Sequence, residues 1–156
     1  MWYLPAIRDT ILGELVKTSP VSVSFKNDLG LSSHAVNCPV IGVYYSTTSD
    51  KELCIKILNT LNNNEKLACL LHEIGHANCD KTNCKCRHPF DRVKSETHAF
   101  EHTLKWLLKN KQKKVLRLEI KHIEELLDIE GCYSEAAKYV MDSKLWRKCL
   151  KYIGRL

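Results

Sequence analysis

Residues 67–77 read LACLLHEIGHA, and their spacing predicts a helix with two chemically different sides. At about 100° per residue, with His72 at zero, the apolar side chains fall between about 140° and 260°; they are Leu67, Leu70, Leu71, Ile74 and Ala77. His72 and His76 fall near 0° and about 40°, on the opposite side, among the small residues Ala68, Cys69 and Gly75. The apolar side is expected to face the core, and the histidines to face a space that can admit a metal ion and another segment.

Residues 72–76 also follow the pattern His-Glu-x-x-His. Two imidazoles four residues apart on a helix can bind one zinc ion, and the intervening Glu73 can act as the base that activates a metal-bound water. A catalytic zinc needs a third protein ligand and an open position for water. The pattern therefore predicts that a further ligand comes from another segment of the chain.

The helix predicted for residues 91–110 offers Glu96 as that ligand. Glu96 falls within the apolar side of this helix, which consists of Ala99, Phe100, Thr103, Leu104, Trp106 and Leu107. A carboxylate among apolar side chains is unfavourable unless it is paired or bound to a metal. Its polar neighbours, His98, Glu101 and His102, point the other way. The alternative is a carboxylate near the helix start that backbone donors satisfy.

The remaining pattern predicts an α+β fold. Apolar residues recur at helical spacing in the segments 4–17, 64–79, 91–110, 113–129 and 134–152. Alternating or β-branched stretches at 21–25, 40–45 and 53–58 predict strands, of which the last two resemble a hairpin. The expectation is a small antiparallel sheet with a hairpin, packed on a helical zincin-type core and followed by extra C-terminal helices.

The length of 156 residues fits one domain, with a zincin-like core over 1–110 and a basic helical extension over 111–156. The whole net charge of +6 comes from residues 105–156. This charge is interpreted as a solvated helix surface; binding of nucleic acid or an acidic partner stays open, although no nucleic-acid motif accompanies it. No basic leader or apolar span is visible, so a cytoplasmic protein without a membrane anchor is expected.

Four potential ligands lie within ten residues at and after the end of the helix predicted for 64–79: Cys79, Cys84, Cys86 and His88. They can form a second, structural zinc site. The chain has eight cysteines but no export signal, so reduced thiols or metal ligands are expected rather than disulfides. A loop with free thiols explains the pattern equally well, because no Cys-x-x-Cys pair is present.

The stretch Leu70-Leu71-His72-Glu73-Ile74-Gly75-His76-Ala77, followed by Glu96-Thr97-His98-Ala99-Phe100, resembles the ImmA/IrrE family of zinc metallopeptidases. The resemblance covers residues 40–108 and implies a gluzincin-like site in which Glu96, shortly before Phe100, completes the zinc site. The usual Glu-Ala-x-x-Phe-Ala of that family reads Glu96-Thr97-His98-Ala99-Phe100-Glu101 here. The resemblance also implies a protein substrate, a transcriptional repressor with a helix-turn-helix domain, in a phage, mobile-element or stress circuit.

The predicted function is zinc-dependent endopeptidase activity, with Zn²⁺ held by His72, His76 and Glu96 and with Glu73 as catalytic base. Six residues could donate a hydrogen bond to the oxyanion: Tyr44, Tyr45, His88, Arg92, His98 and Tyr133. The strand at 40–45 could pair with an extended peptide. Three alternatives stay open. They are a protein-binding module without catalysis, a SprT-like protease that acts on DNA-bound protein and would need His98 or His102 as third ligand, and a helical DNA-binding regulator with an accidental motif.

Overall fold

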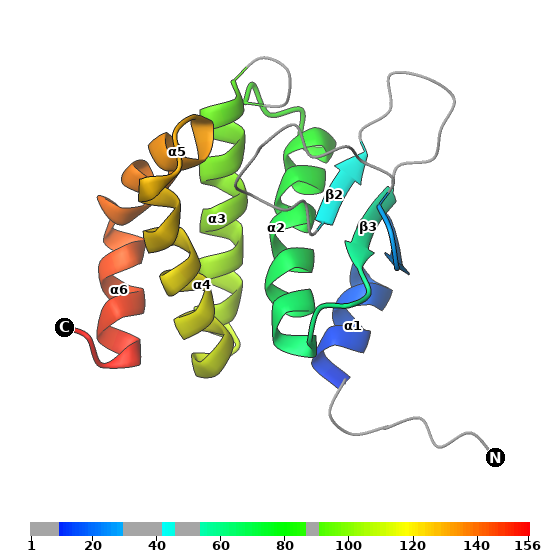
Figure 1. The fold of residues 1–156 in the computed structure, drawn as a ribbon, viewed down its shortest axis with the longest axis horizontal. Helices are drawn as coiled ribbons and strands as arrows, with labels where there is room; N and C mark the ends of the chain where they lie inside the picture. Colours follow the sequence, from blue (N-terminus) through cyan, green and yellow to red (C-terminus); the bar gives the residue numbers. More distant parts are fainter. Residues whose placement is uncertain (1–9, 30–41, 46–53, 87–90) are drawn as a thin grey trace.

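In the computed structural model, residues 10–29, 42–45, 54–86 and 91–156 are described. Figure 1 shows the sheet and α1 on one side of the molecule, the C-terminal helices on the other, and α2 and α3 between them. In chain order the elements are α1 (Thr10–Thr18), β1 (Ser22–Lys26), β2 (Gly42–Tyr45), β3 (Cys54–Leu58), α2 (Asn63–Lys81), α3 (Arg92–Lys109), α4 (Lys113–Glu125), the 3₁₀ turn η1 (Leu126–Asp128), α5 (Cys132–Met141) and α6 (Lys144–Ile153). The fold is α+β.

The sheet has the strand order β1-β3-β2. β2 pairs with β3 in antiparallel orientation, with Gly42 opposite Ile57, whereas β1 pairs with β3 in parallel, with Ser22 opposite Cys54. The prediction of an entirely antiparallel sheet is therefore wrong. Parallel neighbours need a long connection, and the segment between β1 and β3 supplies one that includes β2. Side chains of the central strand β3 alternate between partly and fully buried positions, and Ile55 and Ile57 are the fully buried ones.

Local signals account for the two long helices that follow the sheet. α2 begins with a capping box, in which Asn62 accepts from the Glu65 amide and the Glu65 side chain accepts from the Asn62 amide. α3 begins at Asp91, whose side chain accepts from the Lys94 amide. Both helices run close to their predicted limits, although α2 continues to Lys81. For the first predicted helix, residues 10–18 are helical and residues 4–9 lie outside the described part.

The C-terminal helix predicted for 134–152 is two helices, α5 and α6. The break lies at Asp142 and Ser143. The Ser143 hydroxyl accepts from the Trp146 amide and donates to the Val140 carbonyl, so one side chain ends α5 and begins α6. Beyond this turn, α6 buries Trp146 and Cys149.

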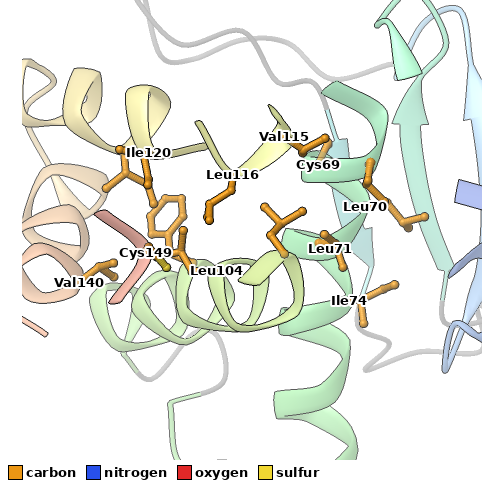
Figure 2. Packing of buried hydrophobic residues seen from close by; sticks show 14 of the residues in the cluster. Cys69, Leu70, Leu71, Ile74, Leu104, Val115, Leu116, Ile120, Val140 and Cys149 are labelled. Carbon is orange, nitrogen blue, oxygen red and sulfur yellow. The ribbon is translucent and has the colours of Figure 1, made fainter. Parts of the chain in front are cut away.

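Side chains of α2 to α6 meet in one hydrophobic cluster, part of which Figure 2 shows. α2 contributes Leu70 and Leu71, α3 contributes Leu104, and the C-terminal helices add residues such as Leu116 and Val140. The basic segment 111–156 thus shares its buried side chains with the helices that carry the His-Glu-x-x-His pattern. Within the described ranges, no helix combines the length and apolar character needed to cross a bilayer.

Candidate metal centre

α2 presents His72 and His76 on the side that faces α3. Their rings lie edge to face, with centroids 4.9 Å apart. The five apolar residues predicted to face the core are all buried, whereas the two imidazoles keep 16% and 17% of their side-chain surface exposed. A helix that is anchored by its apolar side therefore holds both rings at a partly accessible surface.

α3 brings Glu96 to the same place. The Glu96 Oε2 atom lies 2.9 Å from His72 Nε2 and 3.5 Å from His76 Nε2. The ligand atoms of these three residues lie within 4.8 Å of one another, so they form a group that could hold a metal ion. The three residues singled out in the sequence thus come together, although 24 positions separate His72 from Glu96.

Gly75 explains how α2 and α3 approach closely enough. A Cβ atom at Gly75 would lie 2.8 Å from Ala99 Cα and 3.2 Å from His102 Cβ. Contacts under 3.0 Å are essentially never seen, so only glycine allows this crossing without a shift of backbone. The small pair Gly75 and Ala99 sets the distance between the helices on which the imidazoles and Glu96 are carried.

The distances between the donor atoms of His72, His76 and Glu96 can be compared with those in a zinc site. Bonds of about 2.0–2.2 Å to two imidazoles and one carboxylate place tetrahedral donor atoms about 3.3 Å apart. The observed separations of 2.9 Å and 3.5 Å from Glu96 Oε2 bracket this value. Two imidazoles and one carboxylate also leave a position open, as in catalytic zinc sites. The residues present therefore fit the ion.

Strong electrostatic coupling joins the three potential ligands. Burial by itself would lower the pKa of His72, but the hydrogen bond and charge of Glu96, with the charges of Glu73 and Glu119, raise it to about 9. Burial would raise the pKa of Glu96, yet hydrogen bonds from His72 and His76 hold it well below its usual range. Without a cation, a proton on His72 balances the Glu96 carboxylate; a bound cation would replace that proton.

Three further residues act on the rings. No role was predicted for Ser95 and Glu119, and Phe100 was expected only as an apolar residue shortly after Glu96. The Ser95 hydroxyl lies 3.0 Å from His76 Nδ1, which leaves Nε2 directed toward Glu96. The Phe100 ring packs against His72 with centroids 4.7 Å apart. Glu119 on α4 is buried, and its charge acts on His72. A signal for Glu119 was available, because it interrupts the apolar side of α4 as Glu96 interrupts that of α3.

Glu73 lies on α2 where β2 approaches this helix. It is 8% exposed, and its charge acts on both His72 and Tyr133. A Cβ atom at Gly42, the first residue of β2, would lie 2.3 Å from Cys69 Sγ and 3.5 Å from Glu73 Cγ. The glycine thus allows the strand to run directly past the carboxylate predicted to act as the base.

Of the six predicted hydrogen-bond donors for the oxyanion, Tyr133 is the one that lies near the first metal centre among the described side chains. Tyr133, at the start of α5, is close enough to Glu96 and Glu73 that their charges, after burial, raise its pKa. It therefore keeps its phenolic proton at neutral pH. Arg92 is exposed. His88 and the side chains of Tyr44 and Tyr45 lie outside the described part, and His98 belongs to a second group.

That second group consists of Cys79, Cys84, Cys86 and His98, which we call the thiol cluster. Three of its members are the predicted cysteines, and the fourth is His98. The predicted ligand His88 lies outside the described residues. The sequence predicts that His98 faces away from the Glu96 side and offers it as an oxyanion donor or as the third ligand of a SprT-like site, but not as a partner of the cysteines. No local signal connects it to cysteines more than ten residues earlier, because the contact exists only when α2 and α3 pack. His98 and His102 do not belong to the group of His72, His76 and Glu96 among the described residues.

Comparisons with family models, with curated proteins and with solved structures found no match to this chain. A function can therefore be proposed only from the arrangement of side chains.

Proposed function

We propose that this protein is a zinc-dependent metallopeptidase whose metal is held by His72, His76 and Glu96. The observation that carries the proposal is the approach of two imidazole Nε2 atoms, at 2.9 Å and 3.5 Å, to one Glu96 oxygen. Glu73 lies between the two histidines in sequence and is buried beside them. The resemblance to the ImmA/IrrE family agrees with this assignment, and membership of that family stays a prediction.

A zinc ion in this position would polarise the scissile carbonyl and lower the pKa of water toward neutrality. Glu73 would accept a proton from the attacking water and deliver it to the leaving amine. The phenolic O–H of Tyr133 would donate a hydrogen bond to the carbonyl oxygen as negative charge develops there. Ser95 would keep the His76 ring in the orientation that directs Nε2 toward Glu96.

The position of β2 suggests where an extended peptide substrate would bind. This strand pairs with β3 on one side, at the edge of the three described strands, and it begins at Gly42 beside Glu73. An extended peptide that added to its other edge would run past the proposed base. Neighbouring amides of a strand point in opposite directions, so proline at 43 and at 44, in separate variants, should include one that blocks the free edge. If both variants cleave peptides as the wild type does, binding along β2 is wrong.

The substrate we propose is a regulatory protein, a transcriptional repressor with a helix-turn-helix domain, because the family resemblance implies it. A protein-binding module without catalysis would use the same surface but leave its partner intact. A SprT-like protease would instead act on DNA-bound protein and would need zinc bound by His98 or His102. The Glu96→Ala variant distinguishes this last alternative, because it should lose the zinc of the first site together with activity, whereas a site completed by His98 or His102 would keep both.

The decisive experiment measures zinc content and cleavage on the same preparations. Zinc-loaded wild type is incubated with a denatured-protein mixture, and new N-termini are identified by mass spectrometry. Glu73→Gln should keep the zinc of the first site but lose activity by about 10²–10⁴-fold, whereas His72→Ala should lose both the zinc of this site and the activity. Glu101→Gln is the matched control, since Glu101 lies on α3 with Lys105 as its partner, and it should behave as the wild type.

The outcome distinguishes catalysis from binding alone. If the wild type yields no more new N-termini than Glu73→Gln does, the peptidase proposal is wrong and the binding module takes its place. Tyr133→Phe tests the oxyanion donor in the same assay. It should reduce turnover by about 10²–10³-fold with unchanged zinc content, and full activity would exclude Tyr133.

A further inference from the structure

The thiol cluster lies between the C-terminal end of α2 and the second turn of α3. Cys79 belongs to the last turns of α2, Cys84 and Cys86 follow in the next connection, and His98 comes from α3. His98 Nδ1 lies 3.5 Å from the Cys79 sulfur, 3.6 Å from that of Cys84 and 3.1 Å from that of Cys86. Three sulfur atoms therefore surround one ring nitrogen.

Three of the five distances within the thiol cluster lie close to those between the ligands of tetrahedral zinc, and the two that Cys86 makes to Cys84 and to His98 are shorter. Bonds of about 2.3 Å to sulfur and about 2.0–2.1 Å to nitrogen give edges of about 3.6 Å between sulfur and nitrogen and about 3.8 Å between sulfurs. The three sulfur-to-nitrogen separations reach at most 3.6 Å, and the Cys86 sulfur lies 3.5 Å from that of Cys79 and 2.9 Å from that of Cys84. Small outward movements of the side chains would complete the tetrahedron.

We propose that the thiol cluster binds one structural zinc ion, with three thiolates and one imidazole as ligands. Four protein ligands close the coordination shell, which is the arrangement of structural rather than catalytic zinc. The proposal does not depend on peptidase activity, because it rests on a separate set of side chains. The Nδ1 atom of His98 is the nitrogen that faces the sulfurs.

Ordinary packing of free thiols accounts less well for this arrangement. The described cysteines are free, and buried free thiols usually behave as small apolar side chains. Cys149 fits that description, since it lies fully buried in the hydrophobic cluster. Cys86 is equally buried, but it is not part of that hydrophobic cluster and instead faces two sulfurs and an imidazole.

Such a site would hold together the two helices that carry the first metal centre. Cys79 follows His76 by three residues on α2, and His98 follows Glu96 by two residues on α3. The helices also touch at Gly75 and Ala99. A zinc ion at the thiol cluster would therefore fix α3 relative to α2 at a second point, and binding at this site would favour the approach of Glu96 to the histidines.

The test uses the full chain, purified under reducing conditions and loaded with zinc chloride. The wild type should bind two zinc ions per chain, Cys84→Ser and His98→Ala one, and His72→Ala one. Cys54→Ser and His122→Ala are the matched controls, because neither residue belongs to a potential metal group, and both should bind two. His88→Ala should also bind two, which decides between the histidine of the thiol cluster and the one expected from sequence.

Cobalt chloride gives a second readout, which reports the type of ligand and not only the number of bound ions. Cobalt bound by three thiolates shows strong thiolate-to-metal charge transfer in the near ultraviolet, whereas cobalt bound by imidazoles and a carboxylate shows none. The band should appear in the wild type and in His72→Ala, and should weaken or vanish in Cys84→Ser. A wild type that binds one zinc ion and lacks the band would overturn the proposal. Loss of the second ion in His88→Ala, with His98→Ala unchanged, would overturn the assignment of His98.

Failure here is distinguishable from failure of the proposed function. Absence of the charge-transfer band with intact peptide cleavage would contradict only the structural zinc. Absence of cleavage with two bound zinc ions would contradict only the peptidase.

Discussion

Replacing Gly75 by alanine tests whether the close crossing of α2 and α3 positions the first metal centre. The added Cβ atom would start 2.8 Å from Ala99 Cα, and ordinary contact begins at 3.4 Å. The obstacle is backbone, so the helices themselves must separate by several tenths of an ångström. Zinc sites tolerate deviations of about 0.2 Å in ligand distance. The displacement that relieves the clash is therefore larger than the site can absorb.

Two opposite effects set the change in stability. Alanine is favoured over glycine in a helix interior by about 1 kcal/mol, whereas overpacking a buried contact costs about 1–3 kcal/mol. The free energy of unfolding of the zinc-free protein should therefore change by between about 0 and −2 kcal/mol. Zinc affinity should fall by about 10- to 100-fold, the range seen when ligand orientation is disturbed from outside the coordination shell.

Gly13→Ala is the matched control, because Gly13 is also helical and a Cβ there would meet nothing within 4 Å. It should gain up to about 1 kcal/mol from helix propensity and leave zinc affinity unchanged. Urea unfolding gives the stability, and chelator competition in a Cys84→Ser background gives the affinity of the first site alone. If Gly75→Ala matches Gly13→Ala in both measurements, the tight crossing does not position the ligands.

Three further results are expected. Ser95→Ala removes the hydrogen bond to His76 Nδ1 and should weaken zinc binding about 10- to 100-fold by chelator competition, whereas equal affinity would deny Ser95 an orienting role. The pKa of His72 is raised from 6.5 to about 9 in the folded, zinc-free protein, so the stability it contributes is complete below pH 6.5 and is lost as pH rises to 9. The free energy of unfolding, measured with urea, should fall by up to about 3 kcal/mol over this pH range. His72→Ala should not show this fall. Ser143→Ala removes the cap that accepts from the Trp146 amide and should lower the free energy of unfolding by about 1 kcal/mol; an unchanged midpoint would mean that the cap does not stabilise α6.

Much of the site could be predicted from sequence because helical periodicity is local. The positions of His72 and His76 relative to the apolar side of α2 depend only on the rise and turn of one helix. Glu96 could be chosen for the same reason, since a carboxylate on an apolar side is recognised without knowledge of its partner. The start of α2 and the limits of α3 lie within one residue of their predicted positions, whereas α2 continues to Lys81.

The remaining features depend on contacts between distant segments. β1 was expected to run antiparallel, but its direction is set by the connection that leads to β3. The break at Ser143 was not predicted because the apolar spacing continues across it, although the Ser143 hydroxyl caps α6 locally. His98 was assigned to the outer side of α3, and the packing of α3 on α2 places it against the thiols.

The sequence by itself thus determined which side chains can act together on one helix: the two imidazoles of α2, the carboxylate between them, and the exceptional acid on α3. Tertiary structure alone decided which atoms meet across helices. Ser95 reaches His76, His98 reaches three sulfurs, and Gly75 admits Ala99. The physical reason is that a helix fixes the direction of its own side chains through short-range hydrogen bonds, whereas the distance between two helices depends on how their surfaces pack.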